Sequence, residues 1–155
     1  MTDDLRLTTE RLIHAAPERL FRAWTTPELL LSWWGPKGVS CSQAEVDLRV
    51  GGRYLIGNRL PDGGELLITG EFLQVSPPHE LRYTWHVQPP GVPANDARVL
   101  HTETVHVRFE ARGSSTLVSI VHERIVDEAT RVTHLGGWEG CLDGLSEWAD
   151  EATNR

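Results

Sequence analysis

Histidine and glutamate residues at alternating strand positions are the side chains of this chain best suited to chemistry. Seven histidines is a high number for 155 residues. His101 and Glu103 continue the apolar side of one β-strand pattern, and His122 continues the apolar side of the next. His134 lies on the apolar flank of a C-terminal helical pattern. If these apolar sides all face one cavity, the four side chains converge on it.

Three kinds of site would use such residues. A metal site needs at least three ligands in a fixed geometry, and these positions are scattered with no close ligand pair on a helix, so we predict no metal and no cofactor. An acid–base pair of His122 with Glu103 is chemically reasonable, because a carboxylate orients an imidazole and raises its pKa. The third alternative is that these groups orient a ligand or hydrogen-bond within the core. We expect this last alternative and assign no catalytic residue.

Motifs for nucleophilic catalysis and phosphate binding are missing from the sequence. Cys41 and Cys141 lie far apart, and no serine stands in a Gly-x-Ser-x-Gly context. The glycine pairs at 51–52 and 63–64 lack the lysine and the strand-to-helix context of a phosphate loop. We interpret both pairs as turns, and Cys141 as a small buried hydrophobe.

The overall composition narrows the class of protein. A chain of 155 residues fits one domain, spanning residues 1–155, with a core that needs no disulfides. Its 15 Lys and Arg against 22 Asp and Glu give a net charge of -7, which disfavours nucleic acid as a partner. No apolar run approaches the roughly 18 residues that span a bilayer, and the acidic N-terminus is no secretory signal. We therefore expect no membrane insertion and a cytoplasmic location.

A sheet and a long helix must position the residues above. Strand patterns that are separated by turn signals, without helices between them, predict an antiparallel meander. The expected strands cover residues 5–14, 40–50, 53–60, 66–75, 81–87, 102–111 and 116–124. Two short helices follow the first strand, over 17–25 and 27–34, with Thr26 capping the second. The proline-rich segment 88–100 is either an ordinary loop or a flap over a pocket mouth.

The C-terminal helix has the clearest pattern. Asp127 caps its start, and apolar residues recur along one stripe at steps of three and four residues. This stripe consists of Leu135, Trp138, Leu142, Leu145 and Ala149. Gly136, Gly140 and Gly144 lie away from it, each at a cost of about 1 kcal/mol relative to alanine. They either admit the close approach of another backbone, such as that of a second protomer in a homodimer, or are tolerated because packing holds the helix.

The six tryptophans are mainly expected to be structural. Those on helical apolar faces belong to the core, namely Trp24, Trp138 and Trp148. Trp85 lines either the pocket or the outer side of the sheet. Trp33 and Trp34 are adjacent, so we expect only one of them to point inward and the other to be exposed near the pocket entrance or at a partner surface.

An ordered set of short motifs covers nearly the whole chain. The motifs are Ala23-Trp24-Thr25-Thr26-Pro27-Glu28, Trp33-Trp34-Gly35-Pro36, Asp47-Leu48-Arg49-Val50-Gly51-Gly52, Gly70-Glu71-Phe72, Pro77-Pro78, Leu81-Arg82-Tyr83-Thr84-Trp85, Thr116-Leu117-Val118-Ser119-Ile120-Val121-His122 and Gly137-Trp138. In this order they resemble bacterial proteins similar to the C-terminal domain of the activator of the ninety-kilodalton heat-shock protein ATPase. The resemblance implies the START-like helix-grip fold of birch-pollen-type allergens and polyketide aromatases, in which the long helix closes a cavity. It does not fix the function, because one fold hosts many activities.

We therefore predict an α+β helix-grip protein with a curved antiparallel sheet of six to seven strands, a long C-terminal helix and two short helices after the first strand. We expect it to bind a small hydrophobic or aromatic ligand between sheet and helix. The expected ligand-binding residues are Phe21, Trp24, Tyr54, Phe72, Arg82, Trp85, Glu103, Val107, Phe109, Ile120, His122, His134, Trp138, Leu142 and Leu145. Two alternatives are a cyclase- or hydrolase-like enzyme that uses His122 or His134 in the same pocket, and a chaperone-interacting protein of the activator type.

Overall fold

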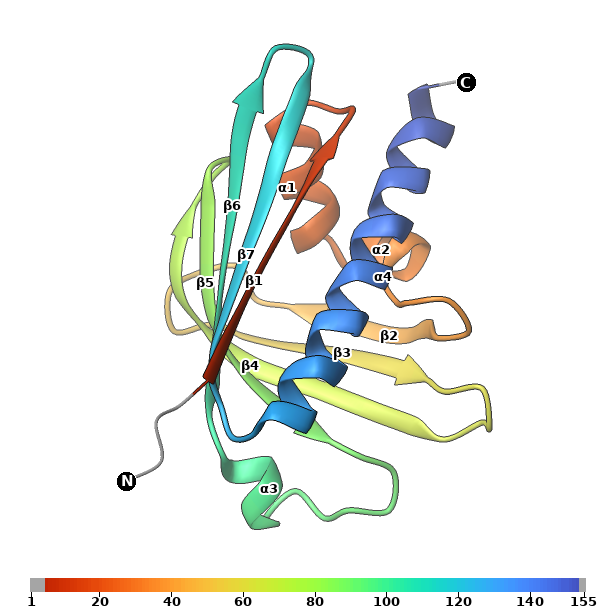
Figure 1. Cartoon of the computed structure of the whole chain (residues 1–155), viewed down its shortest axis with the longest axis vertical. Coiled ribbons are helices and arrows are strands. Elements are labelled where there is room, and N and C mark those ends of the chain that lie inside the picture. Colours follow the sequence, from red (N-terminus) through yellow and green to blue (C-terminus); the bar gives the residue numbers. More distant parts are fainter. Residues whose placement is uncertain (1–4, 154–155) are drawn as a thin grey trace.

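The computed structural model describes residues 5–153, which form seven strands and four helices (Figure 1). In chain order the elements are β1 (Leu5–Ile13), α1 (Pro17–Thr25), α2 (Pro27–Trp33), β2 (Ser40–Val46), β3 (Arg53–Arg59), β4 (Glu65–Ser76), β5 (Glu80–Gln88), α3 (Ala97–Leu100), β6 (Glu103–Arg112), β7 (Ser115–Ile125) and α4 (Glu128–Thr153). All of them except the short helix α3 were predicted, in this order. No helix within these residues has both the length and the apolar character needed to cross a bilayer.

The strands form one antiparallel sheet in the order β1-β7-β6-β5-β4-β3-β2. The meander runs from β2 to β7, and β1 closes the order by pairing with β7, where Leu7 lies opposite His122. The sheet bends strongly, so that β2, β3 and β4 cross the direction of β1, β6 and β7, and α4 lies across the concave side (Figure 1). The predicted helix-grip architecture is confirmed.

The observed elements differ from the predicted ones mainly at their ends, where turns and capping residues set the boundaries. The second strand ends at Val46, because residues 47–52 form tight turns in which Gly51 has a φ of +85°. The segment 88–100 contains α3, whose N-cap Asp96 accepts a hydrogen bond from the backbone N–H of Arg98. Thr26 occupies the N-cap position of α2, but its side chain makes no capping hydrogen bond, so that detail was wrong. Asp127 does cap α4, accepting from the backbone N–H of Thr130 at 2.8 Å.

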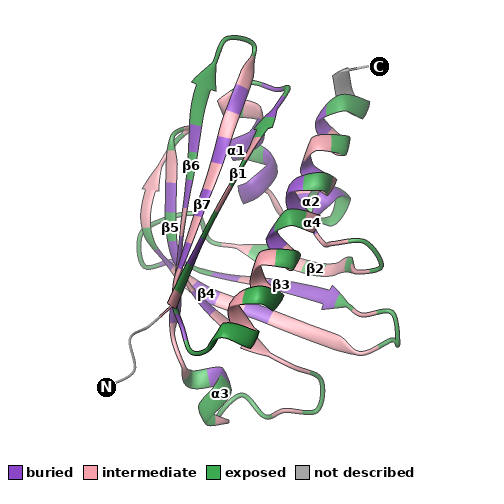
Figure 2. Ribbon diagram, in the orientation of Figure 1, coloured by how far each residue is buried: buried purple, intermediate pink, exposed green. Residues whose placement is uncertain are grey.

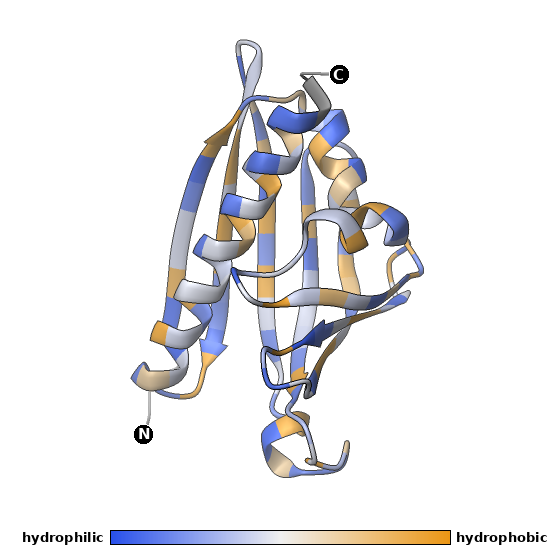
Figure 3. Ribbon diagram, turned by 90° about the vertical axis from the view of Figure 1, so that its right-hand side faces the viewer, coloured by the Kyte–Doolittle hydropathy of each residue, from blue (hydrophilic) through white to orange (hydrophobic). Residues whose placement is uncertain are grey.

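Buried residues line the inner side of the sheet and the facing side of α4 (Figure 2). Four acidic residues of α4 are all exposed, and hydrophilic bands recur along its outer surface (Figure 3). These residues are Glu139, Asp143, Glu147 and Asp150. Asp143 forms an ion pair with Arg11 of β1, at 2.7 Å. The amphipathic pattern of the helix therefore sets its orientation on the sheet.

Aromatic rings, most of them packed edge-to-face, fill the core between α1, α2 and α4. Trp24 stacks on Trp138 with centroids 6.0 Å apart, and Trp33 and Trp34 are both buried around them. The prediction that only one of the adjacent tryptophans points inward was wrong. Helix α2 ends at Trp33 and Trp34 has an extended backbone, with φ of -70° and ψ of 139°, so the two side chains leave the chain in different directions. The indole of Trp33 donates to Ala23 O, and that of Trp34 to Asn58 Oδ1.

The glycines of α4 fall into two groups. A Cβ at Gly140 would overlap Pro36, and one at Gly144 would lie 2.6 Å from the carbonyl oxygen of Trp33. At Gly136 and Gly137 an added Cβ would meet no atom within 4 Å. Gly140 and Gly144 thus admit the chain's own α2–β2 connection, and no second protomer is needed to explain them.

Candidate functional site

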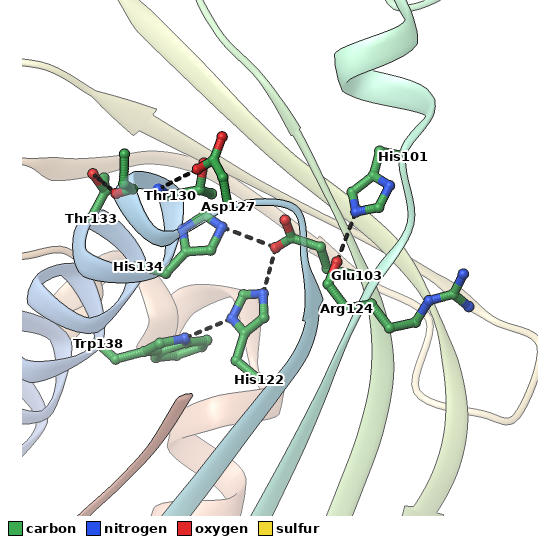
Figure 4. A network of polar contacts seen from close by, with 10 residues as sticks. His101, Glu103, His122, Arg124, Asp127, Thr130, Thr133, His134 and Trp138 are labelled. Carbon is green, nitrogen blue, oxygen red and sulfur yellow. Dashed lines mark hydrogen bonds and ion pairs between the residues drawn. The ribbon is translucent and has the colours of Figure 1, made fainter. Parts of the chain in front are cut away.

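Three neighbouring strands and one helix bring the polar residues of the inner face together. Trp85 on β5 lies opposite Glu103 on β6, and Val105, two residues further along β6, lies opposite His122 on β7. His134 and Trp138 are four residues apart on α4, so they project from the same side of the helix. Figure 4 shows Glu103, His122, His134 and Trp138 pointing toward one another.

Glu103 is the centre of a hydrogen-bonded network (Figure 4). Its Oε1 lies 2.6 Å from Nε2 of His122 and 2.9 Å from Nε2 of His134. The other ring nitrogen of His122, Nδ1, lies 3.0 Å from Nε1 of Trp138. The two imidazoles stack with centroids 4.7 Å apart, and Trp85 meets both edge-on. Glu103 and His122 are buried, with exposed fractions of 6% and 0%.

The indole of Trp138 fixes the tautomer of His122. An indole nitrogen only donates hydrogen bonds, so Nδ1 of His122 accepts and carries no proton. The proton of the neutral ring is therefore on Nε2, where it is donated to Glu103. A positively charged His122 would set two N–H groups against each other at Nδ1.

The charges of the network follow from burial and from these hydrogen bonds. Burial alone would raise the pKa of Glu103, but hydrogen bonds from His122 and His134 outweigh it and lower that pKa to about 2. Burial lowers the pKa of His122 more than the Glu103 carboxylate raises it. The Glu103 carboxylate does raise the imidazole pKa as expected, but burial outweighs it and the net shift is downward. The pair is an ionised carboxylate that accepts from a neutral imidazole.

The same three residues also have the composition of a metal site. Ligand atoms of Glu103, His122 and His134 all lie within 4.8 Å of one another. The convergence of these three side chains was expected from strand alternation and from the apolar flank of the helix, whereas no ligand set could be recognised from their spacing along the chain. As a ligand, however, Nε2 of His122 would have to give up its proton, while Nδ1 already accepts from Trp138. The arrangement present here fits a hydrogen-bonded network and does not fit a metal site.

A pocket of about 390 Å³ opens beside this network, between the N-terminal half of α4 and strands β3, β4 and β5. Its sheet wall includes Leu66, Ile68, Trp85 and Val87, and the α2–β2 connection adds Trp34, Pro36 and Val39. Helix α4 contributes Thr133, His134, Gly136, Gly137, Trp138 and Cys141. Most of the wall is apolar, and His134 joins it to the network around Glu103.

Only three of the expected ligand-binding residues line this pocket, namely Trp85, His134 and Trp138. Most of the others are buried in the packed interior: Phe21, Trp24, Tyr54, Phe72, Val107, Phe109, Ile120, Leu142 and Leu145. Glu103 and His122 lie behind His134. Glu103 hydrogen-bonds to His134, and His122 hydrogen-bonds to Glu103.

Two expected polar contacts lie outside the site. Arg82 is exposed on the outer face of β5, opposite to its buried neighbours Leu81 and Tyr83. His101 precedes the start of β6 and bonds instead to the carbonyl oxygen of Arg124, at 2.7 Å. The strand alternation on which its placement depended does not extend back to it.

Some pocket residues were missed although the sequence held a signal for them. Val87 continues the Trp85 side of β5, and Asn58 is a polar residue within an apolar strand pattern. Asn58 is buried, accepts from Trp34 and donates to the carbonyl oxygens of Ile56 and Leu66. It therefore holds Trp34 in the pocket wall.

Comparisons with known proteins agree with this fold. A family model described as Activator of Hsp90 ATPase homolog 1-like protein matches residues 14–150. No curated protein matches the sequence. Among solved structures, the AHSA1 protein of Silicibacter pomeroyi has a TM-score of 0.80 and 26% identity, covering 97% of this chain and 100% of its own. A protein of Chromobacterium violaceum has a TM-score of 0.78 and 26% identity, covering 94% and 97% respectively.

Proposed function

Because this chain belongs to the Activator of Hsp90 ATPase homolog 1-like family, which includes ligand-binding START-like domains, we propose that it binds a small apolar or aromatic molecule. The binding site is the pocket between the N-terminal half of α4 and strands β3–β5. This places the ligand beside the network of Glu103, rather than among the aromatic rings of the packed core as the sequence suggested.

The observation that carries the proposal is the open apolar wall facing Gly136 and Gly137. The volume of about 390 Å³ falls within the ordinary range for small-molecule sites, roughly 300–1,000 Å³. Burying apolar ligand surface there contributes about 25 cal/mol per Å². Trp85 and Trp138, whose centroids are 5.2 Å apart, line the pocket from the sheet side and from the helix side.

The proposal can be tested by adding a side chain to the pocket wall so that it reduces the pocket volume. The Gly137→Leu variant adds a side chain where an added Cβ meets no atom within 4 Å, so the helix is preserved while pocket volume is lost. The probe is N-phenyl-1-naphthylamine, whose fluorescence rises in an apolar site. We expect saturable binding to the wild type and a loss of affinity of about tenfold in the variant, because the ligand loses buried area worth about 1.4 kcal/mol.

The matched control adds the same side chain to the outer surface of the same helix. Glu139 is exposed there, so Glu139→Leu changes hydrophobicity without touching the pocket and should leave probe affinity unchanged. Unsaturable binding to the wild type, or equal affinities for Gly137→Leu and Glu139→Leu, would remove the proposal.

A second candidate, acid–base chemistry on the bound ligand, is favoured by one observation. His134 is held by ionised Glu103 through Nε2, which is how a carboxylate orients a histidine base. The test measures ring opening of 5-nitrobenzisoxazole, in which a base removes the ring C–H proton and the N–O bond breaks to give a phenolate. A rate that His134→Phe does not reduce would exclude this candidate.

A further inference from the structure

The pocket wall contains few polar groups, and nearly all of them already have partners. Trp34 donates to Asn58, whose amide donates to two backbone carbonyls. Thr133 donates to the carbonyl oxygen of Ala129 at 3.0 Å, and Trp138 donates to His122. A ligand therefore finds these donors occupied.

One acceptor of the wall stays open. Glu103 is ionised and can only accept, so His134, 2.9 Å from it, donates through Nε2. In the neutral ring the lone pair is then on Nδ1, to which no group of residues 5–153 hydrogen-bonds. Trp85 Nε1 is the one side-chain nitrogen or oxygen in this part of the chain that is both fully buried and unpartnered. Nδ1 of His134 is thus accessible, on a ring that lines the pocket.

The unpartnered donor lies on the neighbouring ring. Trp85 is 94% buried, its Nε1–H has no partner among the described residues, and its ring centroid lies 6.0 Å from that of His134. Buried donors in folded proteins nearly always find an acceptor. The pocket therefore presents one open acceptor and, just behind its wall, one donor that lacks an acceptor among the described residues.

From this pairing we infer that the pocket selects apolar ligands that carry a hydroxyl group, with the hydroxyl donating to Nδ1 of His134. A hydroxyl oxygen can also accept, so the same group could satisfy Trp85 after a small shift of the indole. This inference rests on the proposed function and adds its selectivity. Trp138 holds His122 in the tautomer whose Nε2 donates to Glu103, and the Glu103 carboxylate in turn accepts from His134. Glu103 and His122 therefore act as positioning residues for the His134 ring.

The test compares three ligands of nearly the same size at pH 8 by isothermal titration calorimetry. 2-Naphthol carries a donor, 2-methoxynaphthalene only an acceptor, and naphthalene neither. We expect wild type to bind 2-naphthol about fivefold tighter than the other two, since a hydrogen bond made in place of one to water is worth about that much. In His134→Phe the three affinities should become equal, while binding itself persists.

A matched control exists on the outer face of the sheet. His106 on β6 is also held by a carboxylate, Glu80, at 2.6 Å, but it faces away from the pocket. His106→Phe should therefore keep the fivefold preference. Nitrogen-15 correlation spectra of the wild type give a readout that needs no variant, because they distinguish a protonated from an unprotonated Nδ1 in His134.

The possible outcomes separate the two proposals. If no probe binds, the proposed function fails. If all three bind wild type equally, or the preference persists in His134→Phe, the pocket binds ligands but the hydroxyl inference is overturned. A protonated Nδ1 in the neutral His134 ring at pH 8 would also overturn it.

Discussion

The two halves of α4 use the same residue, glycine, for opposite purposes. Toward the C-terminal end, Gly140 and Gly144 let the helix approach Pro36 and Trp33 so closely that a methyl group would collide. One turn earlier, Gly136 and Gly137 face open space beside the sheet. Close approach thus packs the helix against the chain's own α2–β2 connection at one position, and the missing side chains border an apolar pocket at the other.

The tryptophans show the same division. In the closed region, the indole N–H groups of Trp24 and Trp33 both have acceptors. At the pocket, Trp34 and Trp138 donate to Asn58 and His122, whereas Trp85 has no acceptor among the described residues. Indole N–H groups with acceptors belong to the part of the core that stabilises the fold. The one buried indole N–H without an acceptor among the described residues, that of Trp85, lies where we expect a ligand to bind.

The largest effect should come from comparing two tryptophans that border the pocket. Trp138→Phe removes the donor to His122 and leaves Nδ1 as a buried acceptor without a partner, so we expect a loss of about 3 kcal/mol in the free energy of unfolding. Trp85→Phe also shortens a buried ring but removes no hydrogen bond. Its loss should be smaller by about 1–3 kcal/mol. Urea unfolding measures both, and equal losses would show that the tautomer of His122 is not held by Trp138.

A methyl group at Gly140 tests the closed half of α4. Gly140→Ala must push Pro36 away, which as overpacking outweighs the gain in helix propensity, and we expect a net loss of about 2 kcal/mol. For a chain of this length this lowers Tm by about 2–4 °C for each kcal/mol. Gly144→Ala, facing the carbonyl oxygen of Trp33, should behave alike. If both variants were neutral, the close approach would not limit the packing.

Acid should lower the free energy of unfolding through the two buried groups of the network, His122 and Glu103. The folded pKa of His122 lies below its ordinary value of 6.5, so as pH falls through 6.5 the unfolded chain binds a proton that the folded chain does not. The folded pKa of Glu103 is about 2, so between pH 4.5 and 2 the same holds for the carboxylate. Both groups contribute stability above these ranges and lose it as pH falls.

Glu103→Gln isolates the carboxylate part of this pH dependence. The free energy of unfolding, measured in urea at pH 4.5, 3.5 and 2.5, should fall less steeply in Glu103→Gln than in the wild type, because this range contains the carboxylate's proton uptake and lies below that of His122 in the unfolded chain. The outer pair gives the comparison, because hydrogen bonding to His106 also lowers the pKa of Glu80. Glu80 is more exposed, with 28% of its side chain accessible, so Glu80→Gln should flatten the profile less. A steeper profile in Glu103→Gln would contradict the assigned directions.

Most of the fold could be predicted from the sequence, because periodicity and turn residues are local signals. The alternation of buried residues in β6 and β7 correctly placed Glu103 and His122 on the inner face. His101 was misplaced because alternation was extended past the true start of the strand at Glu103. Trp33 and Trp34 were misjudged because helical geometry was extended one residue past the end of α2.

The location of the pocket could not be predicted in the same way. Periodicity tells which side of an element faces inward, but not how far away the opposite layer lies. That distance is set where α4 crosses the α2–β2 connection, through contacts of Gly140 and Gly144 with residues more than a hundred positions earlier. The apolar residues expected to line a cavity, such as Leu142 and Leu145, face the half where the layers touch.

The smallest effect on stability is expected at the open half of α4, where substitution of a glycine should stabilise the fold instead of destabilising it. Gly136 is exposed and an added Cβ meets no atom within 4 Å. Gly136→Ala therefore gains helix propensity without a clash, and we expect the free energy of unfolding to rise by about 1 kcal/mol. Because Gly136 borders the pocket mouth, a single methyl group should reduce N-phenyl-1-naphthylamine affinity far less than Gly137→Leu does. Destabilisation by Gly136→Ala would mean that this half of the helix is as closely packed as the other, and the contrast between the halves would be lost.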